Sequence, residues 1–195
     1  MNRPPLTLAS SSPRRLALLR QAGIEPTRIE APEVDETPLP REQPRAHALR
    51  LAEAKLDAAL DRPGTDAGYV LAADTVVACG RRILPKAQDR ATAERCLNLL
   101  SGRRHRVFGA VAIAGQDGRR AARIALTLVR FKRLDDMELA AYLESGEWQG
   151  KAGGYAIQGR AEAFIPDIGG SYSNVVGLPL ALTVNLLRGL GWPFP

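Results

Sequence analysis

The feature that most constrains the fold is an apolar run over residues 69–79, YVLAADTVVAC, interrupted by a single carboxylate, Asp74. Near-continuous apolar runs of this length are typical of central strands buried on both faces of a sheet. A carboxylate is costly to bury unless it is paired, hydrogen-bonded or bound to a cation. A strand that ends near Asp74 would deliver it to the sheet edge where ligands of α/β proteins bind. The alternative is an aspartate that caps a bend and bonds to Thr75.

The rest of the sequence alternates helix and strand patterns. Apolar residues recur at helical spacing over residues 45–60, and residues 63–64, Pro-Gly, predict the end of that helix. Other predicted helices cover residues 14–22, 91–100, 135–145 and 179–190, and other predicted strands cover 6–9, 106–114 and 121–131, with a short one from 83. A glycine turn joins the two long strands, and glycine-rich loops surround two short strands in the last third. This order predicts an α/β fold with a twisted, mixed sheet, in a single domain over residues 1–195.

The positive charge balance has two explanations, of which one is a polyanionic ligand. The chain has 27 basic and 21 acidic residues, a net charge of +6, and its lysines are only Lys55, Lys86, Lys132 and Lys151. The many arginines reflect either codon usage or a basic cleft. They are scattered, and an aromatic content of 5% leaves few platforms for stacking bases, so we expect no stable nucleic-acid complex.

Cysteine usage and hydropathy predict a cytoplasmic protein without a membrane anchor. Cys79 and Cys96 have no metal-ligand spacing around them, which favours reduced thiols over a disulfide or a zinc site. No apolar stretch approaches the roughly 20 residues needed to span a bilayer. The printed sequence also opens without a charged and apolar leader pattern.

The letters SSSPRR follow the first predicted strand and open the first predicted helix. Ser12 is the expected N-cap, with Pro13 at the first helical position. Arg14 and Arg15 oppose the positive end of the helix dipole, so an anion is expected to offset them. Backbone amides, the Ser10 and Ser12 hydroxyls and two guanidinium groups describe a phosphate site. The alternative is a solvated cap whose arginines extend into water or pair with the acidic loop, the proline-rich and acid-rich segment over residues 32–44.

Further charged residues are candidates for a metal or for substrate. The loop cluster Glu33, Asp35 and Glu36 either supplies an oxygen ligand for Mg²⁺ or Mn²⁺ or is merely solvated. Lys55 lies at the flank of an apolar helix stripe, so its ammonium either reaches a buried cleft or extends to water. Lys86, just beyond the central strand, has the same two outcomes.

The segment KAGGYAIQG, residues 151–159, places glycines on both sides of a predicted short apolar strand, which permits close backbone approach to a ligand. Gln158 is a neutral donor and acceptor suited to a base edge or a water. Residues 169–174 form another small, polar loop. The sequence lacks the common phosphate-loop, dinucleotide-binding, hydrolase-elbow and zinc motifs. The residues alone therefore favour phosphate chemistry without choosing the bond that is cleaved.

Taken in order, these motifs resemble the Maf family of nucleoside triphosphate pyrophosphatases. The ordered set is SSSPRR, VDE, RLAEAK, AADTVV, KAGGYAIQG and GSYSNVVGLPL, over residues 6–187. The resemblance implies an elongated mixed sheet flanked by helices, with two lobes around a cleft, similar to the house-cleaning inosine triphosphatases. It also implies a homodimer and a divalent metal, Mg²⁺ or Mn²⁺. The YAIQG form is similar to the branch that hydrolyses dTTP and UTP to the monophosphate and pyrophosphate, with modified pyrimidines as further candidates.

The resemblance assigns roles residue by residue. The substrate-binding positions are Ser10, Ser12, Arg14 and Arg15, with Thr75 and Gln158 tied to substrate choice. The catalytic positions are Asp74, Glu36, Lys55 and Lys86, of which Asp74 and Glu36 are also the expected metal ligands. One position departs from the family pattern, in which proline directly follows the second lysine. Here Pro85 precedes Lys86 and Ala87 follows it, which leaves the direction of this lysine open.

A different class of function stays open at this point. A nucleotide-binding regulator linked to cell division, without turnover, would need the same phosphate site. A carboxylate in the central strand and two cleft lysines are what turnover requires and plain binding does not. These residues therefore favour the enzyme.

Overall fold

The computed structural model describes residues 4–62 and 68–193, and the helix end predicted at residues 63–64 lies outside them. The strands are β1 (Leu6–Ala9), β2 (Arg28–Glu30), β3 (Tyr69–Cys79), β4 (Arg82–Leu84), β5 (Lys86–Ala87), β6 (Arg104–Ala114), β7 (Arg120–Arg130), β8 (Lys151–Ala152) and β9 (Asp167–Gly169). The helices are α1 (Pro13–Gln21), α2 (Pro44–Leu60), α3 (Arg90–Leu100), α4 (Asp136–Ser145), α5 (Tyr172–Val176) and α6 (Leu180–Gly189), with a 3-10 helix, η1, at Arg160–Phe164.

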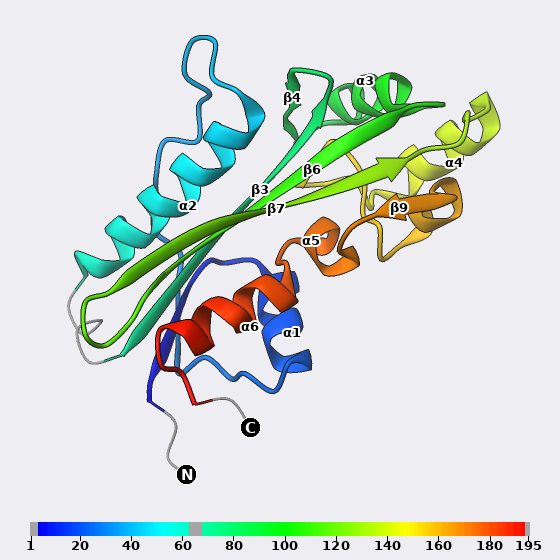
Figure 1. The fold of residues 1–195 in the computed structure, drawn as a ribbon. Coiled ribbons are helices and arrows are strands. Elements are labelled where there is room, and N and C mark those ends of the chain that lie inside the picture. Colours follow the sequence, from blue (N-terminus) through cyan, green and yellow to red (C-terminus); the bar gives the residue numbers. More distant parts are fainter. Residues whose placement is uncertain (1–3, 63–67, 194–195) are drawn as a thin grey trace.

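A long twisted sheet forms the body of the molecule (Figure 1). Three strands of 11 residues each, β3, β6 and β7, give it its length. The strand order is β2-β1-β3-β6-β7-β9. Strand β1 runs parallel to β2 and β3, whereas β3, β6, β7 and β9 pair antiparallel. The prediction of a mixed sheet with residues 69–79 as a central strand is confirmed.

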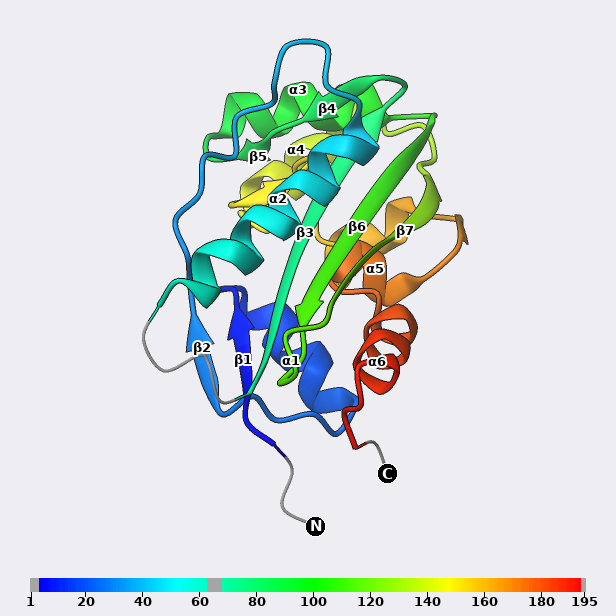
Figure 2. The same ribbon diagram turned by 60° about the vertical axis from the view of Figure 1, so that its left-hand side comes forward.

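Helix α2 lies along one face of this sheet (Figures 1 and 2). The contact is made largely of alanines, such as Ala48 and Ala52 on the helix and Ala72 and Ala110 on the strands. Side chains this small let the helix approach the strands closely. The close approach brings the polar residue of the helix stripe, Lys55, against the sheet.

The opposite face of the sheet carries two separate apolar clusters. One gathers β1, α1, α6 and the start of β3, with Leu19 and Leu71 among its members. The other gathers α3, α4, η1 and the end of β3, with Val77 and Leu97 among its members. These clusters are the cores of two lobes. The two-lobed arrangement expected from the resemblance is therefore present.

The predicted helices and long strands are confirmed, with ends that differ by no more than two residues. The central strand continues past Asp74 to Cys79, because β4 and β6 pair with its second half, so Asp74 lies in the middle of the strand and not at its end. One detail is wrong. Residues 155–157 are a buried irregular segment and not a strand, because the chain turns at Gly153 and Gly154 just before them. The short elements β2, η1 and α5 lack a clear periodicity and were not predicted.

Two further observations concern the cysteines and the helices of the described residues. Cys79 and Cys96 are free thiols. None of the helices described is both long and apolar enough to cross a bilayer.

A close contact between β6 and α5 leaves no room for a side chain at Gly109. A Cβ atom at Gly109 would lie 1.8 Å from Oδ1 of Asn174. Asn174 is fully buried, and its amide nitrogen donates hydrogen bonds to Val107 O on β6 at 3.2 Å and to Thr127 Oγ1 on β7 at 3.0 Å. It therefore has little room to yield. A glycine at this position lets α5 dock on the sheet.

We expect Gly109→Ala to lower the free energy of unfolding by about 1–3 kcal/mol, the usual cost of overpacking a core. The control is Gly189→Ala near the end of α6, where an added Cβ meets nothing within 4 Å. This control should leave stability unchanged or raise it slightly, since alanine favours helix more than glycine does. Chemical denaturation measures both. Equal stability of the two variants would contradict the contact.

Candidate active site

The candidate site lies at a gap in the strand pairing of β3. Strand β1 pairs with β3 only as far as Ala9 opposite Ala72. Strand β4 pairs with the same edge from Val77 onward. Of the residues described, none pairs as a strand with residues 73–76 on this edge, and a cleft of about 470 Å³ opens here. Side chains alternate along a strand, so Asp74 and Thr75 project from opposite faces of the sheet. Both residues line the cleft.

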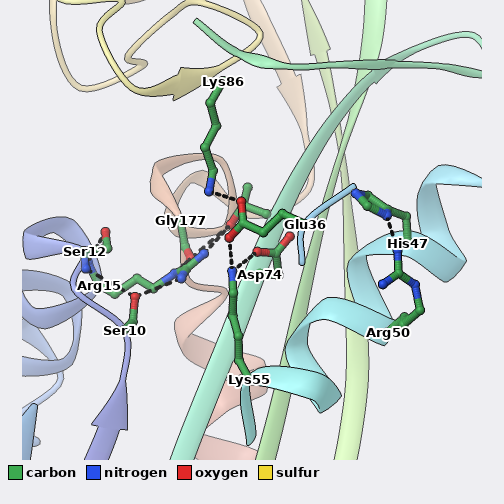
Figure 3. Close-up of polar contacts among 11 residues, drawn as sticks. Ser10, Ser12, Arg15, Glu36, His47, Arg50, Lys55, Asp74, Lys86 and Gly177 are labelled. Atoms are coloured by element: carbon green, nitrogen blue, oxygen red, sulfur yellow. Dashed lines mark hydrogen bonds and ion pairs between the residues drawn. The ribbon is translucent and has the colours of Figure 1, made fainter. Parts of the chain in front are cut away.

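An alternating chain of charges crosses the cleft (Figure 3). Lys55 Nζ donates to Asp74 Oδ1 at 2.6 Å and to Glu36 Oε1 at 2.6 Å. Lys86 Nζ donates to Glu36 Oε2 at 2.5 Å. Lys55 and Asp74 are 8% and 4% exposed, so each buried charge relies on its partner. The chain of charges joins α2, β3, the acidic loop and β5.

Lys55 points into the protein because of its place on α2. Buried positions of this helix recur at 44, 47, 48, 51, 52, 55, 56 and 59. Lys55 occupies a position within this stripe and so faces the sheet. The possibility that its ammonium extends to water is wrong, since Asp74 and Glu36 hold it in the cleft.

Of the acidic cluster, only Glu36 lines the cleft. Partial burial would raise the pKa of its carboxyl, but the hydrogen bonds from Lys55 and Lys86 outweigh this and lower the pKa to about 2. Glu36 is therefore ionised at neutral pH. Glu33 and Asp35 are exposed, and Asp35 Oδ1 accepts a hydrogen bond from the backbone of the same loop at 2.9 Å.

The start of α1 forms the second wall. Ser12 is its N-cap and accepts a hydrogen bond from Arg15 N at 3.4 Å, with Pro13 next, as predicted. The Ser10 hydroxyl accepts from Ser12 N at 3.2 Å. The strand-to-helix junction is thereby fixed, and the arginines of the first helical turn face the cleft.

Arg15 neither extends into water nor pairs with the acidic loop. Its guanidinium donates to Gly177 O at 2.9 Å, to Ser10 Oγ at 3.0 Å and to Thr75 Oγ1 at 3.3 Å. All three acceptors are neutral. Burial lowers the pKa of Arg15, and burial also lowers the pKa of Arg14 beside it. This end of the cleft therefore carries positive charge, and among the residues described no carboxylate is hydrogen-bonded to Arg14 or Arg15.

Residues 155–158 line the wall that faces α1. Tyr142 OH accepts from Ala156 N at 3.1 Å, and Tyr155 OH lies 2.8 Å from His105 Nε2. Burial lowers the pKa of His105 to about 4, so its ring is neutral at neutral pH. These contacts hold the segment in place and leave Gln158 exposed at the cleft. Sequence patterns did not indicate His105, because its partner is 50 residues away.

The structure brings all the predicted site residues to one cleft. They are Ser10, Ser12, Arg14, Arg15, Glu36, Lys55, Asp74, Thr75, Lys86 and Gln158. The unusual placing of Pro85 before Lys86 does not direct the lysine side chain away from the cleft. Pro85 O accepts from Gly153 N at 3.0 Å and Lys86 pairs with Ala152, which places β5 beside β8 and directs the ammonium to Glu36.

The carboxylates of the cleft fit a hard divalent cation. Glu36 and Asp74 share Lys55 Nζ, so their oxygens lie close together. In the part of the chain that the structure describes, no group of three or more His, Cys, Asp or Glu side chains gathers. Two carboxylates suit Mg²⁺ or Mn²⁺ when phosphate oxygens and waters complete the shell. They do not suit zinc, whose sites hold three or four protein ligands that usually include His or Cys, and no His or Cys lines this cleft among the residues described.

A second polar cluster fastens the acidic loop to α2. The Glu42 side chain, 8% exposed, accepts from Arg50 Nε at 2.7 Å and lies 2.8 Å from His47 Nδ1. Arg50 Nη2 also donates to Thr37 O at 3.1 Å, next to Glu36 in sequence. Figure 3 shows Arg50 beside His47 on α2. The cluster therefore fixes the loop beside the cleft carboxylate. It was not predicted, because these side chains follow no motif or period.

Comparison with known proteins finds similarity along nearly the whole chain. A family model described as Maf-like protein matches residues 5–190. The chain is 61% identical over 188 residues to a dTTP/UTP pyrophosphatase of Paramagnetospirillum magneticum, covering 96% of this chain and 97% of that protein. It is 56% identical over 191 residues to a dTTP/UTP pyrophosphatase of Maricaulis maris, covering 98% and 90%. A solved nucleoside-triphosphatase, or dITP/XTP pyrophosphatase, of Mycobacterium abscessus has a TM-score of 0.41 and 18% identity, covering 67% of this chain and 74% of that one.

The contacts of Glu42 predict how stability depends on pH. The hydrogen bond from Arg50 is the main cause that lowers the pKa of Glu42 from 4.5 to about 2. Because the folded pKa lies below the unfolded one, the stabilisation is present above pH 4.5 and is lost as pH falls toward 2. Glu42→Gln should lower the free energy of unfolding at pH 7 by roughly 1–3 kcal/mol and flatten this acid limb.

Denaturation at a series of pH values measures the effect. Glu94→Gln, at an exposed position of α3, is the matched control and should follow the wild-type curve. A Glu42→Gln curve parallel to that of the wild type would show that the carboxylate adds nothing to stability.

Proposed function

This chain belongs to the Maf family, and we propose that it is a nucleoside triphosphate pyrophosphatase that hydrolyses dTTP and UTP. The observation that carries the proposal is the cleft at the gap in β3, where a buried Asp74–Lys55 pair faces an arginine-rich helix start. Relatives named dTTP/UTP pyrophosphatases that match nearly the whole chain support the substrate. The role that fits is removal of unwanted nucleotides from the cellular pool.

The reaction is attack of water on the α-phosphorus. A new P–O bond forms to the water oxygen, the bond from the α-phosphorus to the α–β bridging oxygen breaks, and monophosphate and pyrophosphate leave. Asp74 orients the water and takes its proton as general base. Lys55 fixes one carboxylate oxygen of Asp74 at 2.6 Å. Within residues 4–62 and 68–193 no other group hydrogen-bonds to that carboxylate, so its second oxygen can accept from water.

The arginines, lysines and carboxylates of the cleft have separate roles in binding a polyphosphate. Arg14 and Arg15 bind phosphate oxygens at the start of α1, where no carboxylate of residues 4–62 or 68–193 is hydrogen-bonded to either guanidinium. Lys55 and Lys86 offset the charge that builds up as pyrophosphate departs. Glu36 and Asp74 would hold Mg²⁺ or Mn²⁺, which supplies Lewis acidity and charge neutralisation at the phosphates when bound.

Substrate choice rests on Thr75 and Gln158 in this proposal. Thr75 Oγ1 accepts from Arg15 and donates to Gly177 O at 3.2 Å, so it acts by setting the arginine's position. The Gln158 amide is exposed at the cleft and can donate to a pyrimidine carbonyl and accept from the ring N–H. The family match over residues 5–190 supports a single domain. A homodimer and a cytoplasmic location remain predictions.

The test of the proposed reaction is an assay of products. Purified protein with Mg²⁺ or Mn²⁺ should convert UTP and dTTP to the monophosphate and pyrophosphate. Its kcat/KM for these should exceed that for ATP and GTP by at least roughly tenfold, a difference that one or two base contacts supply. Release of orthophosphate with diphosphate accumulating would disprove the cleavage site. Tight nucleotide binding without turnover would favour a regulator.

Asp74→Asn removes the carboxylate charge while keeping the shape of the side chain. We expect kcat for UTP to fall by on the order of 100-fold or more, because the base is lost. Asp57→Asn, at an exposed ion pair with Arg120, is the matched control and should keep wild-type turnover. Circular dichroism checks that both variants are folded. Near-native turnover in folded Asp74→Asn would move the chemistry to another residue.

A further inference from the structure

Lys151 is the cleft lysine to which the proposed reaction gives no role. It lies in β8, is half-buried and lines the cleft. Its Nζ donates to Gln149 O at 2.9 Å, a backbone carbonyl of its own turn. Lys55 and Lys86 each bond to a carboxylate, whereas no carboxylate of the described residues pairs with Lys151. Its charge is therefore left for a ligand.

The backbone around Lys151 is held firmly. Gly153 and Gly154 adopt φ values of 73° and 71°, in the left-handed region that favours glycine. A Cβ atom at Gly153 would lie 2.9 Å from Val77 Cγ1, and one at Gly154 would lie 3.2 Å from Ala93 Cα. The turn thus packs directly on β3 and α3. Because this packing already fixes the backbone that carries the Lys151 ammonium, the chain loses little further conformational entropy when a ligand binds.

Lys151 and Arg14 form a pair of like charges on two walls of the cleft. Burial lowers the pKa of Lys151, and the positive charge of Arg14 lowers it further. Glu147 opposes this effect from a distance, but its carboxylate accepts from the backbone of Arg160 at 2.8 Å. An anion placed between the two cations would relieve their repulsion. A chain of phosphates carries enough charge, over enough length, to contact both walls.

We propose that Lys151 is a further substrate-binding residue, which with Arg14 holds the polyphosphate chain of the substrate between β8 and α1. The inference rests on the proposed function for the identity of the substrate. It does not rest on turnover, because the ligand class is any linear polyphosphate, including the free pyrophosphate product. Lys151 also differs from Lys55 and Lys86 in kind, since it contributes binding without sharing a carboxylate with the catalytic residues.

The test is calorimetric titration of inorganic pyrophosphate, with Mg²⁺, into the wild type, Lys151→Gln and Lys151→Arg. Loss of one charge-assisted contact should raise the Kd of Lys151→Gln roughly tenfold or more, and the arginine variant should retain most of the affinity. The control is Lys132→Gln, which removes the same charge outside the cleft, where Lys132 pairs with Glu138. It should bind pyrophosphate as the wild type does. In turnover, Lys151→Gln should raise KM for UTP more than it lowers kcat.

Equal Kd values for the wild type and Lys151→Gln would overturn the inference. So would an equal loss in Lys132→Gln, which would mean that overall charge and not position is decisive, or a wild type that does not bind pyrophosphate. Melting temperatures without ligand check folding, and Lys151→Met, which keeps the aliphatic stem, replaces Lys151→Gln if that variant unfolds. Failure of the proposed function would look different: no monophosphate would form from any triphosphate, while the pyrophosphate titrations would still report on Lys151.

Discussion

The buried ion pair between Lys55 and Asp74 is the contact on which the cleft depends. Two charges are taken out of water here, and removing one partner would leave the other uncompensated, at a cost of about 3–5 kcal/mol. The pair forms because alanines on α2 and on the strands let the helix lie close to the sheet. The contact that seats the helix therefore also holds the carboxylate at the cleft and links it through Lys55 to Glu36.

A break in strand pairing gives the site its shape. Strands β1 and β4 are only four and three residues long, and they leave the middle of β3 open between them. Neighbouring residues of one strand therefore contact different elements. Asp74 bonds to Lys55 of α2, whereas Thr75 bonds to Arg15 of α1 and to Gly177 in the loop after α5. In doubly wound α/β proteins the ligand crevice lies beyond the strand ends. Here it lies alongside the middle of a strand.

The irregular segments at the cleft are each held by buried polar contacts. Glu42 and Arg50 fasten the loop that presents Glu36, and Tyr142 with His105 fixes the wall that carries Gln158. Side chains held in this way lose little further freedom when a ligand binds.

The sequence by itself determined the local structure and the presence of an unusual carboxylate. The apolar run of β3, the helical stripe of α2 and the Ser12 cap are patterns within short windows, so backbone geometry and solvent exclusion fix them locally. The partners of the charges were decided only in the tertiary structure. Lys55 meets Asp74 across 19 residues, and Arg15 meets Gly177 across 162. Such pairs depend on how closely separate elements dock, and packing over the whole chain sets that distance.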